Sequence, residues 1–176
     1  MKIFIKSLFS LGFLLCIFSI NSYSQFSLTQ PIPVDPNVKV GKLPNGLTYY
    51  IEKNSKPEKK MELRLVVNAG SVLEDPDQLG LAHFMEHMNF NGSKHFPKNE
   101  LVDYLQKIGV KFGADLNANT SFDQTIYILP ISTDDPEIVE KGFTVLEDWA
   151  GNNLLDKTEI DKERGVVLEE SRLSKG

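Results

Sequence analysis

The chain has 176 residues, a formal net charge of −5, 41% hydrophobic residues and a single cysteine. This length and hydrophobic fraction fit one modest globular domain or a piece of a larger one. The acidic balance and the lack of any run of lysine and arginine argue against nucleic acid as a partner.

The first 24 residues are expected to be a secretory signal peptide. They contain two early lysines, an apolar run and small residues near the end: Lys2, Lys6, 8–20, Ser22 and Ser24. An uncleaved membrane anchor is the alternative, but the run is short for a span of about 20 residues. Cleavage would also remove the only cysteine, so the mature chain would lack disulfides and thiolate ligands. We therefore expect secretion across an inner membrane, into a bacterial periplasm, with no stable membrane anchor.

The first half of the remaining chain predicts strands and then a helix. After a proline-rich leader (25–37), residues 38–54 alternate around Asn45-Gly46, which predicts a β-hairpin with an Asn-Gly turn. A third strand is expected over 61–69. A helix that opens at 75–78 should follow and carry the sequence LGLAHFMEHMNFNG, residues 79–92.

The second half predicts another helix, then two strands and two further helices, so the whole order is strands, two helices, strands, two helices. A helix over 99–109 should end at a glycine, followed by strands over about 111–118 and 123–131 and helices over about 136–150 and 157–173. This mixture predicts an α+β fold in which a mainly antiparallel sheet is covered by helices. Because the last helix ends the chain with charges in mid-helix, residues 38–176 are expected to be the N-terminal portion of a truncated domain.

Two of the three histidines lie within five residues, in HFMEH at 83–87. In a helix, His83 and His87 stand one above the other and Glu86 projects from the same side. Two neutral imidazoles can bind one divalent metal, and a carboxylate beside them can take a proton from metal-bound water. Histidines on a helix can also be surface residues or hydrogen-bonded core residues. The H-x-x-E-H pattern is nevertheless a metalloprotease motif, the inverse of H-E-x-x-H.

A catalytic zinc usually has three protein ligands, so the two histidines need a further partner. The last predicted helix offers Glu159, Glu163 and Glu170 along one stripe. Such a stripe is also typical of a solvated helix face. Spacing alone leaves the choice open.

The joint pattern resembles the pitrilysin-type zinc peptidases of family M16, inverzincins that include the insulin-degrading enzymes and mitochondrial processing peptidases. The resemblance is carried by HFMEH and, about seventy-five residues later, by DKERGVVLEE. It extends to LPNGLTYYI, to VNAGSVLEDPDQLGLAHFMEHMNFNGSKHFP and to LNANTSFDQTIY, and so covers nearly everything from Val38 onward. The implied fold is similar to that of the mitochondrial processing peptidase-like metallohydrolases.

The resemblance implies a zinc-dependent endopeptidase that hydrolyses peptides or small proteins. Its residue pattern implies that His83, His87 and Glu163 hold one zinc ion and that Glu86 is the general base. A supporting acid about two turns before the ligand glutamate would be Asp156, with Glu159 as the competitor.

Further implications concern the substrate and the partner. Asn117 and Ala118 match a segment along which the family binds its substrate as an added β-strand, although an ordinary polar turn is the alternative. The family's chamber is built from paired homologous domains. A second homologous domain or subunit is therefore expected, and this chain alone is expected to be inactive.

Two other functions compete with a zinc peptidase as interpretations of the sequence. An S-ribosylhomocysteine lyase has a related motif but uses a cysteine ligand, which a thiol-free mature chain would lack. A non-catalytic binding or scaffold subunit of a two-part peptidase would have lost a ligand or the base, and neither is missing here.

Overall fold

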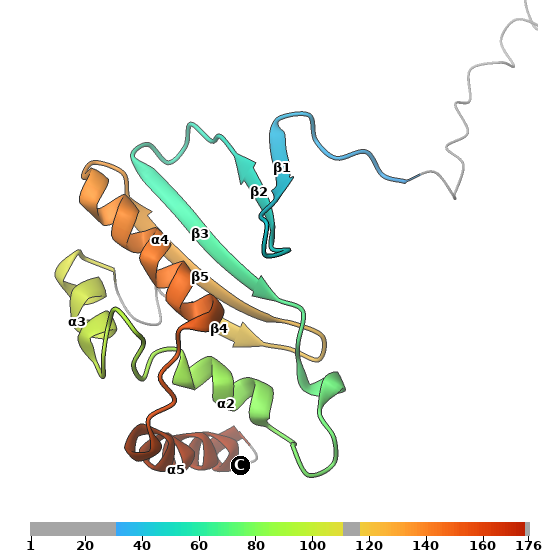
Figure 1. The fold of residues 1–176 in the computed structure, drawn as a ribbon, viewed down its shortest axis with the longest axis vertical. Helices are drawn as coiled ribbons and strands as arrows, with labels where there is room; N and C mark the ends of the chain where they lie inside the picture. Colours follow the sequence, from blue (N-terminus) through green and yellow to red (C-terminus); the bar gives the residue numbers. More distant parts are fainter. Residues whose placement is uncertain (1–30, 111–116, 175–176) are drawn as a thin grey trace, which may run out of the picture. The chain divides into compact units, whose positions relative to one another are not determined.

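The computed structural model describes residues 31–110 and 117–174, in two units that divide after Lys53 (Figure 1). In the first unit, β1 (Val38–Lys42) and β2 (Thr48–Glu52) pair antiparallel. Gly46 has a φ of 93°, in the region that favours glycine, and its N–H donates to the carbonyl of Leu43 at 2.9 Å. The predicted hairpin and its Asn-Gly turn are confirmed. The predicted signal peptide, 1–24, lies outside the described residues.

The second unit is built on a sheet of order β3-β5-β4, in which both pairs are antiparallel. The strands are β3 (Lys60–Val67), β4 (Asn117–Thr120) and β5 (Thr125–Ser132). Side chains of β5 alternate between buried and half-buried, as in a strand with one face in the core. The α+β class with an antiparallel sheet is thus confirmed. Of the strand expected over 111–118, residues 111–116 lie outside the described part, and β4 continues to Thr120.

Helices cover this sheet, and α4 (Pro136–Gly151) lies along β3 and β5 (Figure 1). Gly142 allows this close approach, because a Cβ there would come within 2.7 Å of Ile131 Cδ1 and 3.0 Å of Leu63 Cδ1. The α3 helix (Glu100–Lys107) adds apolar residues to the same core. The core residues are Leu63, Phe96, Leu101, Leu105, Val110, Tyr127, Leu129, Ile131, Val145 and Trp149.

The helix that carries the HFMEH motif, α2 (Leu81–Met88), is shorter than expected. The sequence predicted that it opens at 75–78. Instead, those residues form a turn in which the N–H of Gln78 donates to the carbonyl of Asp75 at 2.8 Å. Gly80 then adopts a φ of 91°, which no α-helix contains, so the helix begins only after it.

The end of α2 is fixed against the end of α4. The indole N–H of Trp149 donates to the carbonyl of Asn89 at 3.1 Å, and the Asn153 amide donates to Asn89 Oδ1 at 3.0 Å. The last helix, α5 (Lys157–Ser174), then returns to lie beside α2 (Figure 1).

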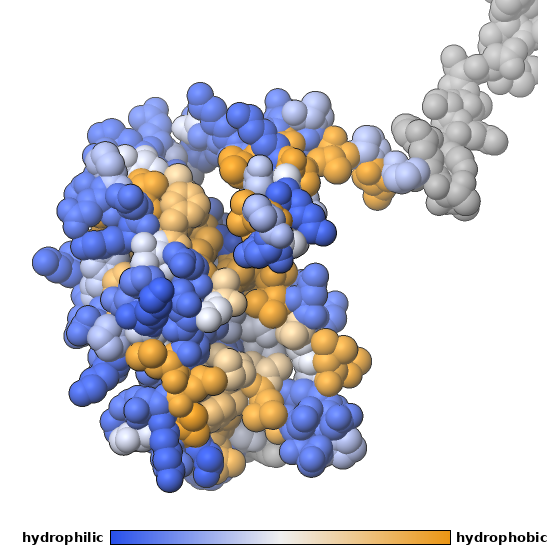
Figure 2. Space-filling model, viewed as in Figure 1, coloured by the Kyte–Doolittle hydropathy of each residue, from blue (hydrophilic) through white to orange (hydrophobic). Residues whose placement is uncertain are grey.

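Several apolar side chains remain exposed in this unit, and Figure 2 shows apolar patches among the charged surface of one face. On α5 these residues are Val166, Leu168 and Leu173. No helix in the described part of the chain combines the length and the hydropathy needed to cross a membrane.

Candidate metal centre

The two motif histidines face each other on α2. His83 and His87 are one helical turn apart, their ring centroids are 4.7 Å apart, and their Nε2 atoms are 3.2 Å apart. Two nitrogens bound to one tetrahedral zinc at ordinary bond lengths lie about 3.4 Å apart. The pair therefore has the separation that a shared metal ion needs.

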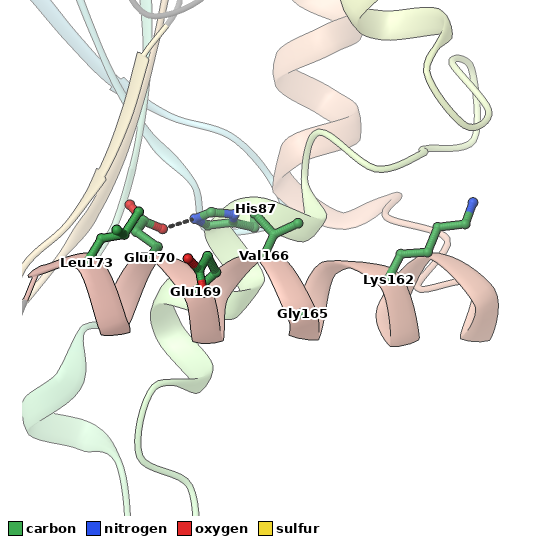
Figure 3. A pocket seen from close by; sticks show the side chains of 7 residues that line it. All are labelled: His87, Lys162, Gly165, Val166, Glu169, Glu170 and Leu173. Atoms are coloured by element: carbon green, nitrogen blue, oxygen red, sulfur yellow. Dashed lines mark ion pairs between the residues drawn. The ribbon is translucent and has the colours of Figure 1, made fainter.

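Glu170 on α5 supplies a third donor at the same place. Its Oε2 lies 3.3 Å from Nε2 of His87 and 3.8 Å from Nε2 of His83, and the three atoms lie within 4.8 Å of one another. Figure 3 shows Glu170 and the ring of His87 pointing toward each other. Two imidazole nitrogens and a carboxylate oxygen are a donor set that suits zinc and leaves a fourth position for water. The residues present thus fit the metal.

A surface pocket along α5 reaches this donor set (Figure 3). Its wall combines the polar ends of His87 and Glu170 with apolar side chains, so a ligand entering it would meet both kinds of surface. The lining residues are His87, Lys162, Gly165, Val166, Glu169, Glu170 and Leu173.

Glu163, the glutamate expected from the sequence to be the third ligand, does not belong to this group of donors. Its Oε1 lies 2.7 Å from Nδ1 of His87, and its Oε2 accepts a hydrogen bond of 2.6 Å from the amide of Asn91. Glu163 and Glu170 are seven residues apart, so they share one face of α5 but lie about 10.5 Å apart along its axis. Glu163 consequently meets the far edge of the His87 ring, and only Glu170 reaches the Nε2 atoms.

Glu163 can nevertheless control the imidazole. A carboxylate on Nδ1 keeps the proton on that nitrogen, which leaves the Nε2 of His87 free to bind a metal. The Glu163 side chain is only 14% exposed, compared with 55% for Glu170. Glu163 also has a second hydrogen-bond partner, because the Asn91 amide donates to its Oε2.

Glu86, the expected general base, lies on α2 between the histidines in sequence but outside the donor group. It is buried, and its Oε2 accepts a hydrogen bond from the hydroxyl of Thr120 on β4. Glu86 is therefore not one of the three grouped donors, and its expected role as the general base stays a prediction.

The N-terminus of α2 is held by an acid from outside the helix. Glu74 accepts the N–H of Gly80 at 2.7 Å and the N–H of Ala82 at 2.8 Å. These hydrogen bonds, first that from Ala82 and then that from Gly80, hold the pKa of the Glu74 carboxyl below its usual value. Glu74 thus satisfies free N–H groups at the start of the helix that carries the histidines.

The two acids proposed as supporting groups make local contacts. Asp156 accepts the N–H of Thr158 at 2.8 Å and that of Glu159 at 3.3 Å, and these hydrogen bonds lower the pKa of its carboxyl. It therefore caps the N-terminus of α5. Glu159 pairs with Lys162 at 2.8 Å on the same helix. The carboxylate that contacts Nδ1 of His87 is that of Glu163.

The expected substrate-binding residues lie on β4. In the backbone register, Asn117 pairs with Ile128 and Ala118 with Tyr127 of β5. Because the described sheet has the order β3-β5-β4, β4 forms one of its edges. An edge strand has free backbone groups to which an extended peptide can pair.

Comparison with known proteins gives the family. The family model described as "Insulinase (Peptidase family M16)" matches residues 49–174. The chain belongs to this family. Within it, the chain is 44% identical over 160 residues to a protein of Haemophilus influenzae named "Probable zinc protease PqqL", and 37% identical over 141 residues to the Escherichia coli protein of the same name. These alignments cover 90% and 80% of this chain, but only 17% and 15% of the relatives.

Solved structures of M16 peptidases have the same fold. The crystal structure of the first half of the periplasmic protease PqqL from Escherichia coli matches with a TM-score of 0.78 at 37% identity, over 81% of this chain and 30% of that one. The ferredoxin protease FusC matches with a TM-score of 0.68 at 31% identity, over 77% of this chain and 15% of that one. The α+β fold of this chain is therefore that of M16 peptidase domains, over part of their length.

Proposed function

We propose that this chain provides the metal-binding part of a zinc-dependent endopeptidase that cleaves peptides or small proteins. The observation that carries the proposal is the meeting of Nε2 of His83, Nε2 of His87 and Oε2 of Glu170 within 4.8 Å, in a chain that belongs to the M16 family. His83, His87 and Glu170 would hold one zinc ion, and Glu163 would orient His87 through its Nδ1.

When bound, zinc would activate a water molecule and polarise the scissile carbonyl. Glu86 would accept the proton of the attacking water and deliver it to the leaving amine. Its burial beside the histidines, outside the donor group, supports this assignment. The substrate would pair as an added strand along the free edge of β4, next to Asn117 and Ala118.

The relatives and the sequence support a location and a partner. The Escherichia coli relative is described as a periplasmic protease, and residues 1–24 have the pattern of a signal peptide, so the protein would act in a bacterial periplasm. Because the chain spans about a sixth of the two PqqL relatives, a second homologous domain or subunit would complete the chamber.

The test uses the protein as its gene encodes it, with any sequence that adjoins this chain. Elemental analysis should find one zinc per HFMEH motif, and a quenched peptide should be cleaved in a way that a chelator abolishes. His83→Ala and His87→Ala should lose both zinc and cleavage. Stoichiometric zinc without any cleavage of a broad peptide library would favour a binding or scaffold subunit instead.

A further inference from the structure

We propose that Thr120 is a positioning residue for peptide hydrolysis, which holds one carboxylate oxygen of Glu86 so that the other oxygen is presented to the attacking water. This inference rests on the proposed function. The Thr120 hydroxyl on β4 donates to Oε2 of Glu86, across 34 residues of sequence. Thr120 is half-buried and Glu86 is buried, so little solvent competes for this hydrogen bond.

The neighbouring hydroxyl of Thr125 does not take the place of Glu86 as the partner of Thr120. Thr120 pairs directly with Thr125 of β5, and the two Oγ1 atoms lie 3.4 Å apart. The Thr125 hydroxyl, however, donates its single proton to the carbonyl of Ala69 at 2.9 Å. Because each hydroxyl has one proton, that of Thr120 goes to the Glu86 carboxylate, which can only accept when it is ionised.

This hydrogen bond restricts a side chain that would otherwise rotate. A glutamate has three side-chain torsions, and proton transfer requires its oxygen within about 3 Å of the water. With Oε2 held by Thr120, the carboxylate has less freedom to rotate and Oε1 is the oxygen left for the proton. Such fixed geometry lowers the entropic cost of reaching the transition state.

The same strand also connects the base to the substrate. Ala118 and Thr120 are two residues apart on β4, so their side chains share one face of the sheet. A peptide paired to the edge of β4 is positioned by the strand that also positions Glu86. The scissile bond and the general base would then keep a fixed register with each other.

The test compares variants that remove or retain the hydroxyl, in the zinc-loaded protein as encoded. Thr120→Val removes the hydroxyl with little change of shape, and loss of a hydrogen bond to a charged group should lower kcat roughly 10- to 100-fold. KM and zinc content should change less than about twofold. Thr120→Ser keeps the donor and should retain kcat within a few fold. Thr144→Val is the control, since that exposed hydroxyl on α4 bonds only to the Glu140 carbonyl of its own helix.

A double substitution distinguishes positioning from a general structural role. In a Glu86→Gln background there is no base to position, so adding Thr120→Val should cause no further loss of kcat. An equal, additive loss in both backgrounds, or full activity of Thr120→Val, would overturn the proposal. If Thr120→Val is unstable, Thr120→Ala carries the same expectation, and failure of both to fold while Thr120→Ser folds would show the role to be structural.

These outcomes also separate this inference from the function on which it rests. A wild-type protein without chelator-sensitive cleavage refutes the proposed function. A wild-type protein that cleaves, is inactivated by Glu86→Gln and tolerates Thr120→Val refutes the role of Thr120 alone.

Discussion

His87 is held on both edges of its ring by one helix: Nδ1 lies 2.7 Å from Oε1 of Glu163, while Nε2 lies 3.3 Å from Oε2 of Glu170. The two carboxylates are two turns apart on α5. This geometry supports the proposal that Glu163 orients the imidazole and that Glu170 shares a metal ion with it.

This division of roles predicts different effects on zinc affinity. Glu170→Gln should abolish stoichiometric zinc, because it removes one of three ligands. Glu163→Gln should retain zinc but weaken its binding roughly 10- to 100-fold, as expected for loss of a partner that orients a ligand. Titration with a competing chelator measures both constants.

The matched control for these two variants is Glu169→Gln. Glu169 lines the same pocket as Glu170, but its carboxylate pairs with Arg172 and lies outside the donor group. The zinc affinity of the Glu169→Gln variant should equal that of the wild type. If Glu163→Gln lost zinc completely while Glu170→Gln kept it, the assignment drawn from the sequence would be right and that drawn from the geometry wrong.

A second prediction concerns Glu86. Because it lies beside the donors and not among them, Glu86→Gln should keep one zinc per site. Peptide hydrolysis should fall by a factor on the order of 10² or more through loss of the general base. Parallel zinc and turnover measurements on one preparation check this. Loss of zinc in this variant would mean that Glu86 binds the metal.

Spacing in the sequence predicts the pair of histidines, but it leaves open whether Glu163 or Glu170 is the third ligand. His83 and His87 are four residues apart, and helical geometry alone brings them together. Glu163 and Glu170 lie on the same face of α5, so choosing between them requires the offset of α5 along α2. The position of α5 along α2 depends on tertiary packing, and residue spacing in the sequence does not predict it.

Two other features also depend on conformation or packing that the sequence pattern does not predict. The sequence predicts too early a start for α2 because the acidic segment 75–78 has the composition of a helix start. The decisive feature is the conformation of Gly80. Thr120 lies in a polar stretch, and nothing in the sequence indicates a role for it. Only the register of β4 with β5 and the contact of β4 with α2 bring its hydroxyl to Glu86.

A third prediction concerns the carboxylate that caps α2. Glu74→Gln should lower the free energy of unfolding by about 1 kcal/mol, the typical effect of losing an N-terminal cap. Zinc affinity should fall modestly as well, since the capped turn precedes His83. Denaturant unfolding with and without zinc measures both effects. Asp77→Asn, an exposed acid in the preceding turn, removes the same charge and should change neither value.

The last prediction concerns Asp148, which is 1% exposed at the end of α4. Its Oδ2 accepts from the Ser93 hydroxyl at 2.5 Å and from the His95 N–H at 3.0 Å, while its Oδ1 contacts the His95 ring at 2.8 Å and the Asn152 amide at 3.2 Å. Asp148 thereby fixes the loop that follows α2. Asp148→Asn places an amide opposite several of these donors, and should lower the free energy of unfolding by about 2 to 3 kcal/mol.

The pKa of Asp148 also predicts how the stability of the wild type changes with pH. Burial raises the pKa of the Asp148 carboxyl, but the hydrogen bonds from Ser93, His95 and Asn152 outweigh it and leave the pKa below its usual value. A carboxyl whose pKa is lower in the folded state stabilises the fold above its unfolded pKa of about 3.9, and this contribution is lost as the pH falls through the folded value. The wild type should therefore lose stability more steeply than Asp148→Asn below about pH 4. Urea unfolding at a series of pH values measures the difference between the two proteins, and a difference that stayed constant from pH 7 to pH 3 would contradict an ionised Asp148 in the folded state.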